Sequence, residues 1–356
     1  MATDNKDKKV LNVPPLRFPE FNGEWEEKKL QDIAPNISSG KDKISKSGII
    51  ALYGSTGIIG KTDSASYKED IVLVARVGAN AGQMQIGYAP CGVTDNTLVI
   101  DAKEWNYFIY YYLQHYNLNR LVFGSGQPLI TGGMLKKIKI RYSNKVERNK
   151  IIRLLYLLDE RIATQNKIID KLESLIKGIR DSVFRNLSGK VTHLSEIADI
   201  YQPRTISSND LTPDGYLVYG ANGIIGKFKS FNHEKEQICI TCRGNTCGTV
   251  NYTQPKAWIT GNSMVINIDK NQDIVDKRFL YHYLSTFNFI NIISGSGQPQ
   301  IVRSPLKLIK VVLPVKERQM QIARNIDVIL KMINIDNSIL SLLNKQKQYL
   351  LYQMFI

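Results

Sequence analysis

The chain has 356 residues, enough for two or three domains whose cores need no disulfide or metal ion. Lys and Arg number 47 against 32 Asp and Glu, and the net charge of +15 favours a polyanionic partner, nucleic acid before an anionic membrane. A hydrophobic share of 43% excludes wholesale disorder, and no apolar run approaches the roughly 18 residues that span a bilayer. Four cysteines and a polar start without an apolar signal core predict a cytoplasmic protein with reduced thiols.

In chain order, each half of the sequence predicts short strands, a helix, a short apolar and basic segment and then a long helix. In the first half these are residues 71–74, 106–116, 138–140 and 146–184. In the second half they are residues 238–241, 277–287 and 309–313, with a long helix after Pro314. Glycines crowd the ends of the strand-like runs, where tight turns need positive φ.

The second half repeats the motifs of the first in the same order. YGSTGIIGK at 53–61 returns as YGANGIIGK at 219–227, and NTLVI at 96–100 returns as NSMVI at 262–266. GSGQP occurs at 124–128 and again at 295–299, and Glu147-Arg148 matches Glu317-Arg318. A period of about 170 residues is too long for a solenoid repeat and predicts duplicated domains.

Both long helices carry an apolar residue at a seven-residue step, which predicts a coiled coil rather than two surface helices that each pack on their own domain. We expect the helices to pair antiparallel, with the two globular halves at opposite ends and Gln165 close to Asp336. The predicted seam consists of Leu155, Leu158, Ile162, Gln165, Ile169, Leu172, Ile176 and Ile179 in the first helix, and Ile326, Ile329, Ile333, Asp336, Leu340, Leu343 and Leu350 in the second.

The predicted fold is therefore α+β, with two homologous α/β domains of mixed strands separated by two long helices, and with a pseudo-twofold internal repeat. We expect globular domains over residues 1–145 and 190–315, and helices over residues 146–189 and 316–356.

The candidate motifs for catalysis and metal binding do not match the patterns that those functions require. GSTGIIGKT at 54–62 has the wrong spacing for a nucleotide-binding loop. Cys239, Cys242 and Cys247 have a spacing seen in zinc sites, but the equivalent positions around Val72, Ala75 and Ala81 are small and apolar, which favours buried structural cysteines. No aromatic residue follows Pro14-Pro15 as in adenine methyltransferases. The sequence thus predicts a binding protein without catalytic residues, bound metal or cofactor of its own.

Side chains suited to DNA recognition lie in the strand and loop regions of both halves. Arg reads guanine, Asn and Gln read adenine, and Lys mainly contacts phosphate, although any single one of these residues is more often an ordinary surface residue. The candidates are Lys61, Arg76, Asn80 and Gln83 in the first half and Lys227, Arg243, Asn245 and Thr246 in the second.

The whole chain resembles the specificity subunit of a type I restriction–modification system. The resemblance rests on VPPLRFPEFNGEWEEKKLQD at 13–32, the two YGxxGIIGK blocks, the two GSGQP blocks and the long helix after each half. It implies that each half holds a target-recognition domain followed by a spacer helix. It further implies that the helices pair antiparallel, measure the gap between two half-sites and dock two methyltransferase subunits, to which restriction subunits join.

The expected function is recognition of a split, asymmetric sequence in double-stranded DNA within a complex for restriction, adenine methylation and host defence. S-adenosylmethionine, ATP and Mg²⁺ are expected on the partner subunits. The alternatives are a coiled-coil scaffold with two protein-binding heads, the specificity subunit of a fused restriction–methylation enzyme and a free-standing modification enzyme. A scaffold would show no salt-sensitive affinity for DNA, and a free-standing modification enzyme would bind the methyl donor itself.

Overall fold

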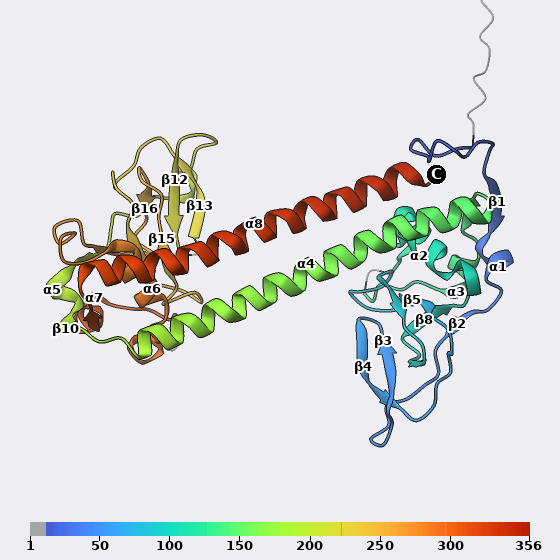
Figure 1. The fold of residues 1–356 in the computed structure, drawn as a ribbon, viewed down its shortest axis with the longest axis horizontal. Helices are drawn as coiled ribbons and strands as arrows, with labels where there is room; N and C mark the ends of the chain where they lie inside the picture. Colours follow the sequence, from blue (N-terminus) through green and yellow to red (C-terminus); the bar gives the residue numbers. More distant parts are fainter. Residues whose placement is uncertain (1–11, 125, 222, 296) are drawn as a thin grey trace, which may run out of the picture. The chain divides into compact units, whose positions relative to one another are not determined.

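The computed structural model describes residues 12–124, 126–221, 223–295 and 297–356 (Figure 1). Three residues of the repeated motifs, Ser125, Asn222 and Ser296, lie outside this description. The chain divides into two compact units: residues 1–166 with 338–356 form the first, and residues 167–337 form the second. Within the described residues, no helix is both long and apolar enough to cross a membrane.

The first unit is built on a four-stranded antiparallel sheet with the strand order β2-β8-β5-β6. A three-stranded sheet, β4-β3-β7, and a two-stranded ribbon, β1-β9, complete it. The elements are β1 Glu26–Lys29, α1 Leu30–Ile33, β2 Ile37–Ser39, β3 Ile50–Gly54, β4 Gly57–Thr62, β5 Ile71–Ala75, β6 Met84–Gly87, β7 Cys91–Val93, β8 Thr97–Ile100, η1 Lys103–Trp105, α2 Asn106–Tyr116, η2 Leu118–Leu121, α3 Gly132–Lys136, β9 Lys139–Tyr142 and the first part of α4 Lys145–Arg185.

The second unit repeats this plan strand for strand. Its sheets have the orders β11-β17-β14-β15, β13-β12-β16 and β10-β18. The elements are β10 Lys190–His193, α5 Leu194–Ile197, β11 Asp199–Tyr201, η3 Ser208–Asp210, β12 Tyr216–Gly220, β13 Gly223–Phe228, β14 Ile238–Thr241, β15 Val250–Tyr252, β16 Trp258–Ile259, β17 Ser263–Asn267, α6 Lys277–Ser285, η4 Phe289–Ile292, α7 Arg303–Lys307, β18 Lys310–Leu313 and α8 Lys316–Met354, whose last part belongs to the first unit. The α+β fold with an internal repeat is confirmed.

The central strand of each main sheet is buried on both faces, which explains its continuous apolar run. In β5, Val72 and Val74 pack into the main core with α2, whereas Ile71 and Leu73 pack against Tyr53 on the other face. In β14, Ile238 and Ile240 pack with α6, and Cys239 takes the opposite face with Tyr219. Alternation along one strand thus joins the two cores of each unit.

The long helices run antiparallel where they meet inside each unit. Leu155, near the start of α4, shares a core with Leu351, near the end of α8, in the first unit. In the second unit Ile176, late in α4, shares a core with Ile326, early in α8. Every predicted seam position is buried or partly buried. That Gln165 and Asp336 lie close together stays a prediction.

One predicted repeat match is out of register. The sequence pairs Arg148 with Arg318, but the structure makes Arg148 equivalent to Gln319. Arg148 Nη1 donates to Ser143 O at 3.1 Å, and Gln319 Nε2 donates to the equivalent carbonyl, Pro314 O, at 2.9 Å. The helices therefore repeat after 171 residues, as do α2 and α6, while β8 and β17 repeat after 166. The second unit accordingly contains five more residues between β17 and α6.

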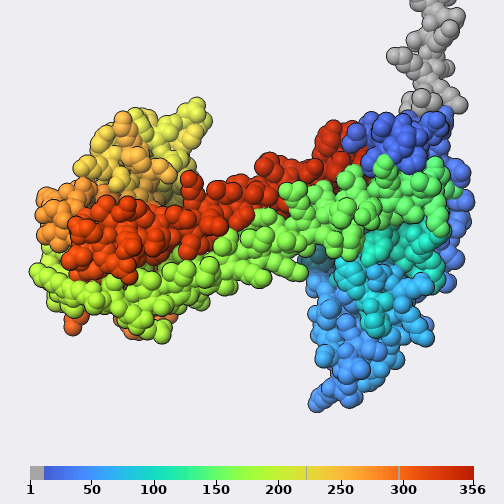
Figure 2. Space-filling model, viewed as in Figure 1, coloured from blue at the N-terminus to red at the C-terminus, as the bar shows by residue number. Residues whose placement is uncertain are grey.

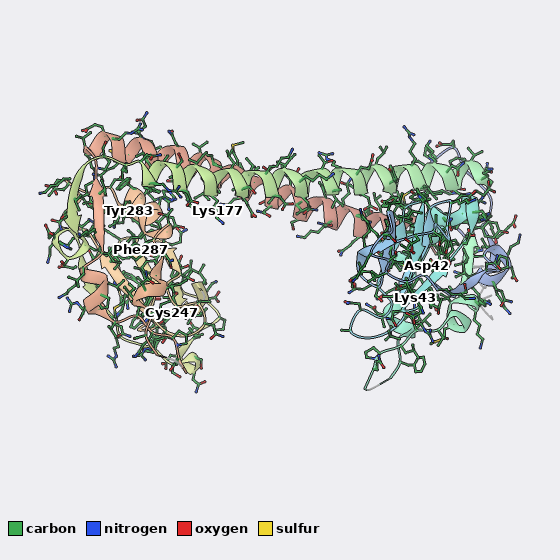
Figure 3. The ribbon with its side chains drawn as sticks, turned by 90° about the horizontal axis from the view of Figure 1, so that it is seen from below. Asp42, Lys43, Lys177, Cys247, Tyr283 and Phe287 are labelled. Carbon is green, nitrogen blue, oxygen red and sulfur yellow. The ribbon has the colours of Figure 1, made fainter. Side chains whose placement is uncertain are left out.

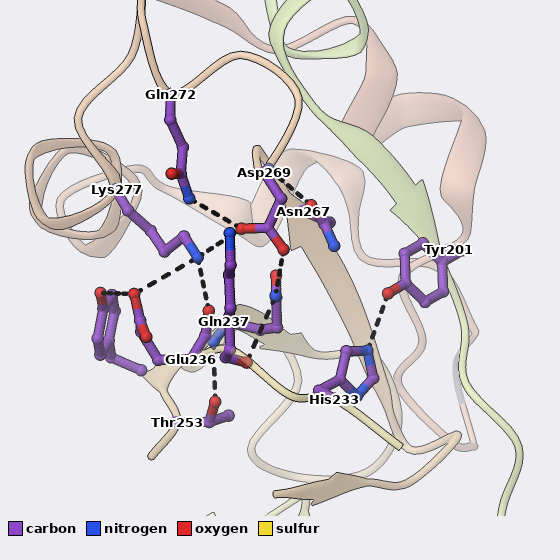
Figure 4. Close-up of polar contacts among 11 residues, drawn as sticks. Tyr201, His233, Glu236, Gln237, Thr253, Asn267, Asp269, Gln272 and Lys277 are labelled. Atoms are coloured by element: carbon purple, nitrogen blue, oxygen red, sulfur yellow. Dashed lines mark hydrogen bonds and ion pairs between the residues drawn. The ribbon is translucent and has the colours of Figure 1, made fainter. Parts of the chain in front are cut away.

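A buried lysine fixes this longer connection in the second unit (Figure 4). Lys277 Nζ donates to Asp269 Oδ1 at 2.8 Å and to Glu236 O at 2.7 Å, and Gln237 Nε2 donates to Asp269 Oδ2 at 3.0 Å. Burial raises the pKa of the Asp269 carboxyl, but hydrogen bonds from Lys277 and Gln237 outweigh burial and hold that pKa below its ordinary value. The network stabilises the connection that has no counterpart in the first unit.

Candidate nucleic-acid interface

Three loops meet at one edge of the first unit, and we call this surface the first loop edge. They are the turn of the β3–β4 hairpin at residues 54–57, the β5–β6 loop at residues 76–83 and the described part of the GSGQP loop, residues 124 and 126–128. Ser55 Oγ donates to Asn96 O at 3.0 Å, and Arg76 N donates to the same oxygen at 3.0 Å. Gly78 N donates to Pro128 O at 2.9 Å, which joins the second loop to the third.

The second unit builds the same surface, the second loop edge, from the described residues 220, 221, 223, 242–249, 295 and 297–299. Thr246 Oγ1 donates to Ala221 O at 3.1 Å, and Gly244 N donates to Pro299 O at 3.0 Å. Gly78 and Gly244 both have positive φ, +80° and +84°, so glycine is required at this point of each loop. The GSGQP motif is therefore a structural partner of the loop after the central strand in both units.

The shared hydrogen bonds fix which residues of the two edges are equivalent. Ile130 N donates to Arg76 O at 2.9 Å, and Ile301 N donates to Cys242 O at 3.0 Å. Arg76 is therefore the counterpart of Cys242, and by the same register Arg243 is the counterpart of Val77. The two edges share one backbone but present different side chains.

The predicted DNA-binding residues all lie on these two edges or on the hairpins that border them. In the first unit Gln83 and Lys61 are exposed, Asn80 is half-buried, and Arg76 Nη1 donates to Ser39 Oγ at 3.2 Å. In the second unit Arg243 and Asn245 are exposed, while Thr246 is half-buried. Lys227 Nζ lies 3.8 Å from Asp214 Oδ1. The structure thus gathers each predicted set around one loop edge.

A basic segment borders the first loop edge before β3. Lys41, Lys43 and Lys46 are exposed there, and Figure 3 shows Asp42 and Lys43 on this segment of the first unit. Ser45 N donates to Lys61 O at 2.9 Å, so the segment lies beside β4. The Asp42 carboxylate accepts hydrogen bonds from Val93 N at 2.7 Å and Ser66 Oγ at 2.6 Å. The surrounding lysines create a positive surface of the kind that attracts phosphate.

The cysteines belong to the protein core and the second loop edge. Cys239 is buried on β14, and burial raises the pKa of its thiol to about 12. Its counterpart is Leu73 and that of Cys242 is Arg76, which corrects the predicted equivalence with Val72 and Ala75, whereas Cys247 is equivalent to Ala81 as predicted. Cys247 lies in the loop that follows β14 (Figure 3). Among the described residues, no group of three His, Cys, Asp or Glu side chains could hold a metal ion.

Sequence reasoning missed an apolar part of both surfaces. Ile58 and Ile59 follow the hairpin turn of the first unit and are exposed, as are Ile224 and Ile225 in the second. Their repetition within YGxxGIIGK was visible in the sequence. An apolar pair in a strand ordinarily predicts burial, whereas β4 and β13 lie at the edges of their sheets and contain a bulge at the second isoleucine.

These features define a protein with two equivalent α+β domains, each carrying one loop edge, that are connected through long helices. The family model for the type I restriction modification DNA specificity domain matches residues 22–174 and again residues 189–345. The chain belongs to this family.

Two curated relatives support the assignment over part of the chain. A type I restriction enzyme specificity subunit of Escherichia coli is 28% identical over 146 residues, which is 40% of this chain and 36% of the relative. A putative type I restriction enzyme specificity subunit of Haemophilus influenzae is 27% identical over 139 residues, 38% of this chain and 35% of the relative. The matched region therefore spans about a third of the length of these relatives.

Solved structures share the fold. The crystal structure of the S subunit of a type I restriction–modification system from M. genitalium matches with a TM-score of 0.74 and 19% identity, covering 97% of this chain and 99% of that one. A chain from a structural study of complex assembly and conformational transition of the type I system matches with a TM-score of 0.55 and 15% identity, covering 92% and 96%.

Proposed function

We propose that this chain is the noncatalytic DNA-recognition subunit of a type I restriction–modification complex in the cytoplasm. Its two recognition domains, residues 1–145 and 190–315, each read one half of a split, asymmetric target in double-stranded DNA. The helices over residues 146–189 and 316–356 set the spacing between the half-sites and dock two methyltransferase subunits. S-adenosylmethionine, ATP and Mg²⁺ bind to the partner subunits, and restriction subunits join the complex through them.

The observation that carries this proposal is one backbone framework presenting two different sets of side chains. Loops 76–83 and 242–249 have the same hydrogen bonds, yet Arg76 stands where Cys242 does and Val77 stands where Arg243 does. Two domains with the same loop geometry but different hydrogen-bond donors suit the recognition of two half-sites that differ in sequence. The net charge of +15 supplies the sequence-independent attraction that brings DNA to both.

The test is the pattern of methylated adenines in the host genome, recorded by single-molecule sequencing with and without the gene. Loss of methylation at one split motif on deletion is the expected result, and full-length protein should restore it. An unchanged methylation pattern, together with no salt-sensitive DNA affinity of the purified complex, would favour the scaffold alternative.

Single substitutions then test the two recognition domains separately. Arg76→Ala should relax or abolish recognition of one half-site and Arg243→Ala that of the other, each at a cost of about 1–3 kcal/mol for a base contact. The matched control variants are Lys103→Ala and Lys270→Ala. These lysines follow β8 and β17, beyond the ends of those strands that lie away from the loop edges. Both controls should leave the motif and the affinity unchanged.

A further inference from the structure

The exposed isoleucine pairs are the most unusual feature of the two hairpins. Ile58 and Ile59 are 62% and 48% exposed, and Ile224 and Ile225 are 56% and 45% exposed. Two adjacent apolar side chains in solvent forgo the stabilisation that burial of each would bring. The same arrangement is built in both units, which indicates a contact that both units make.

The backbone holds each pair in the same way. A Cβ on Gly54 would lie 2.9 Å from Cγ2 of Ile59, and a Cβ on Gly220 would lie 2.9 Å from Cγ2 of Ile225. In both hairpins, the side chain of the second isoleucine therefore packs over the glycine that ends the strand before the turn. The hairpins also share a bulge in the strand after the turn. Ile59 is the extra residue between the pairs Tyr53–Ile58 and Leu52–Gly60, and Ile225 is the extra residue at the equivalent point of the second hairpin.

The isoleucines stand directly beside the loops proposed to read DNA. They follow the turns that hydrogen bonds tie to the rest of the loop edges, through Ser55 in the first unit and Thr246 in the second. In Figure 2 part of the β3–β4 hairpin, in blue, is visible at the surface of the first unit. A duplex seated on a loop edge therefore meets the isoleucine pair of that unit.

Charge around the first pair indicates a polyanionic partner. Lys61 pairs with Ala51 and Ile58 pairs with Tyr53, two residues further along β3, so Lys61 lies on the same face of the hairpin as Ile58. Lys41, Lys43 and Lys46 are exposed on the segment beside β4. Asp63, the acidic residue that follows β4, accepts hydrogen bonds from Ser45 Oγ at 2.8 Å and Ser47 Oγ at 3.1 Å.

We propose that each hairpin presses its isoleucine pair into a groove of the DNA as an apolar wedge that contacts both half-sites alike. The proposal rests on the function proposed above. Equivalent residues of the reading loops differ between the units, whereas the GIIGK segments are identical, so these segments contact what the half-sites have in common. A thymine methyl group would be read as sequence, but an apolar side chain placed between base steps bends a duplex without such readout.

The test uses the full-length chain in complex with its methyltransferase subunits and a labelled duplex carrying the mapped motif. The variants are Ile58→Ser/Ile59→Ser and Ile224→Ser/Ile225→Ser. Ile274→Ser serves as the control, since this isoleucine is 54% exposed and lies outside both hairpins. Each double variant should bind roughly tenfold more weakly to the target and to an unrelated duplex. It should also bend the DNA less, as measured by energy transfer between labelled duplex ends, and should methylate the same motif.

Three results would overturn the wedge. The first is wild-type affinity and bending in both double variants. The second is loss of the methyltransferase subunits from the purified complex with unchanged DNA affinity of the chain, which would assign the isoleucines to a protein contact. The third is a changed methylation motif, which would make them sequence readers. Absence of DNA binding by the wild-type complex would instead refute the proposed function itself, and thermal melting of each variant excludes unfolding as the cause.

Discussion

At the residue scale, a lysine occupies the apolar seam of the first unit. Lys347 Nζ lies 2.6 Å from Asp159 Oδ1, and the two side chains are 17% and 30% exposed. Tyr111 donates its hydroxyl to Asp159 Oδ2 at 3.0 Å. A charge this far removed from water needs its partner, because an unpaired buried ion loses hydration without compensation.

Removing that partner should destabilise the protein. Asp159→Asn is expected to lower the free energy of unfolding by about 1–2 kcal/mol, because Lys347 then keeps its charge without a carboxylate. Glu173→Gln, at an exposed position of the same helix, is the control and should have almost no effect. Urea unfolding measures both, and equal midpoints for the two variants would show that the ion pair contributes nothing.

A second buried group links the stability of the second unit to pH. His282 is fully buried, and its Nε2 lies 2.8 Å from Asp327 Oδ1 while its Nδ1 lies 3.2 Å from Arg180 Nη2. Burial lowers the pKa of His282 to about 4, although the Asp327 carboxylate opposes this shift; Arg180 and Arg278 lower it further. Because Arg180 can only donate, the neutral ring accepts at Nδ1 and donates from Nε2 to Asp327.

The folded protein therefore disfavours protonation of His282, while the unfolded chain takes up this proton near the ordinary pKa of 6.5. The contribution to stability is fully present above pH 6.5 and is lost as the pH falls toward about 4, by up to roughly 3 kcal/mol. His282→Asn should flatten the dependence of the melting temperature on pH in this window. Equal slopes in wild type and His282→Asn would contradict the prediction.

At the scale of elements, apolar runs in the sequence located the buried strands β5 and β14, and helical patterns located α2, α6 and the two long helices. The expected helix at residues 106–116 is α2, and the expected strand at 238–241 is β14. The β1–β9 ribbon was not predicted, since β1 reads EEKK with all four residues exposed and pairs with a strand more than a hundred residues away. The convergence of the loop edges likewise depends on backbone hydrogen bonds between distant segments, which side-chain patterns do not encode.

The long helix α4 contains a residue that weakens it. Gly178 is exposed, and an added Cβ there would meet nothing within 4 Å. Gly178→Ala should raise the free energy of unfolding by about 1 kcal/mol, since alanine restricts the unfolded chain and favours the helix. Gly189→Ala is the opposite control, because its Cβ would lie 2.3 Å from Leu313 O. Thermal unfolding of both variants should give shifts of opposite sign, and no rise for Gly178→Ala would refute the helix argument.

At the scale of the whole molecule, the internal repeat allows each loop of one unit to be compared with its counterpart in the other unit. Loops 76–83 and 242–249 have the same length, the same backbone hydrogen bonds and positive-φ glycines at equivalent positions, Gly78 with Gly244 and Gly82 with Gly248. One loop can therefore replace the other without strain in the surrounding sheet. If these loops read bases, a protein with two copies of one loop reads the same bases in both half-sites at those positions.

Replacing residues 242–249 by the sequence of 76–83 should change the half-site read by the second unit toward that read by the first. The reciprocal exchange should change the other half-site, and in each case the unaltered half-site and the spacing should remain. Adenine methylation mapped across the genome measures all three at once. An unchanged motif in both exchanges would place sequence reading outside these loops, whereas loss of all methylation with intact folding would mean that the loops support DNA binding without selecting bases.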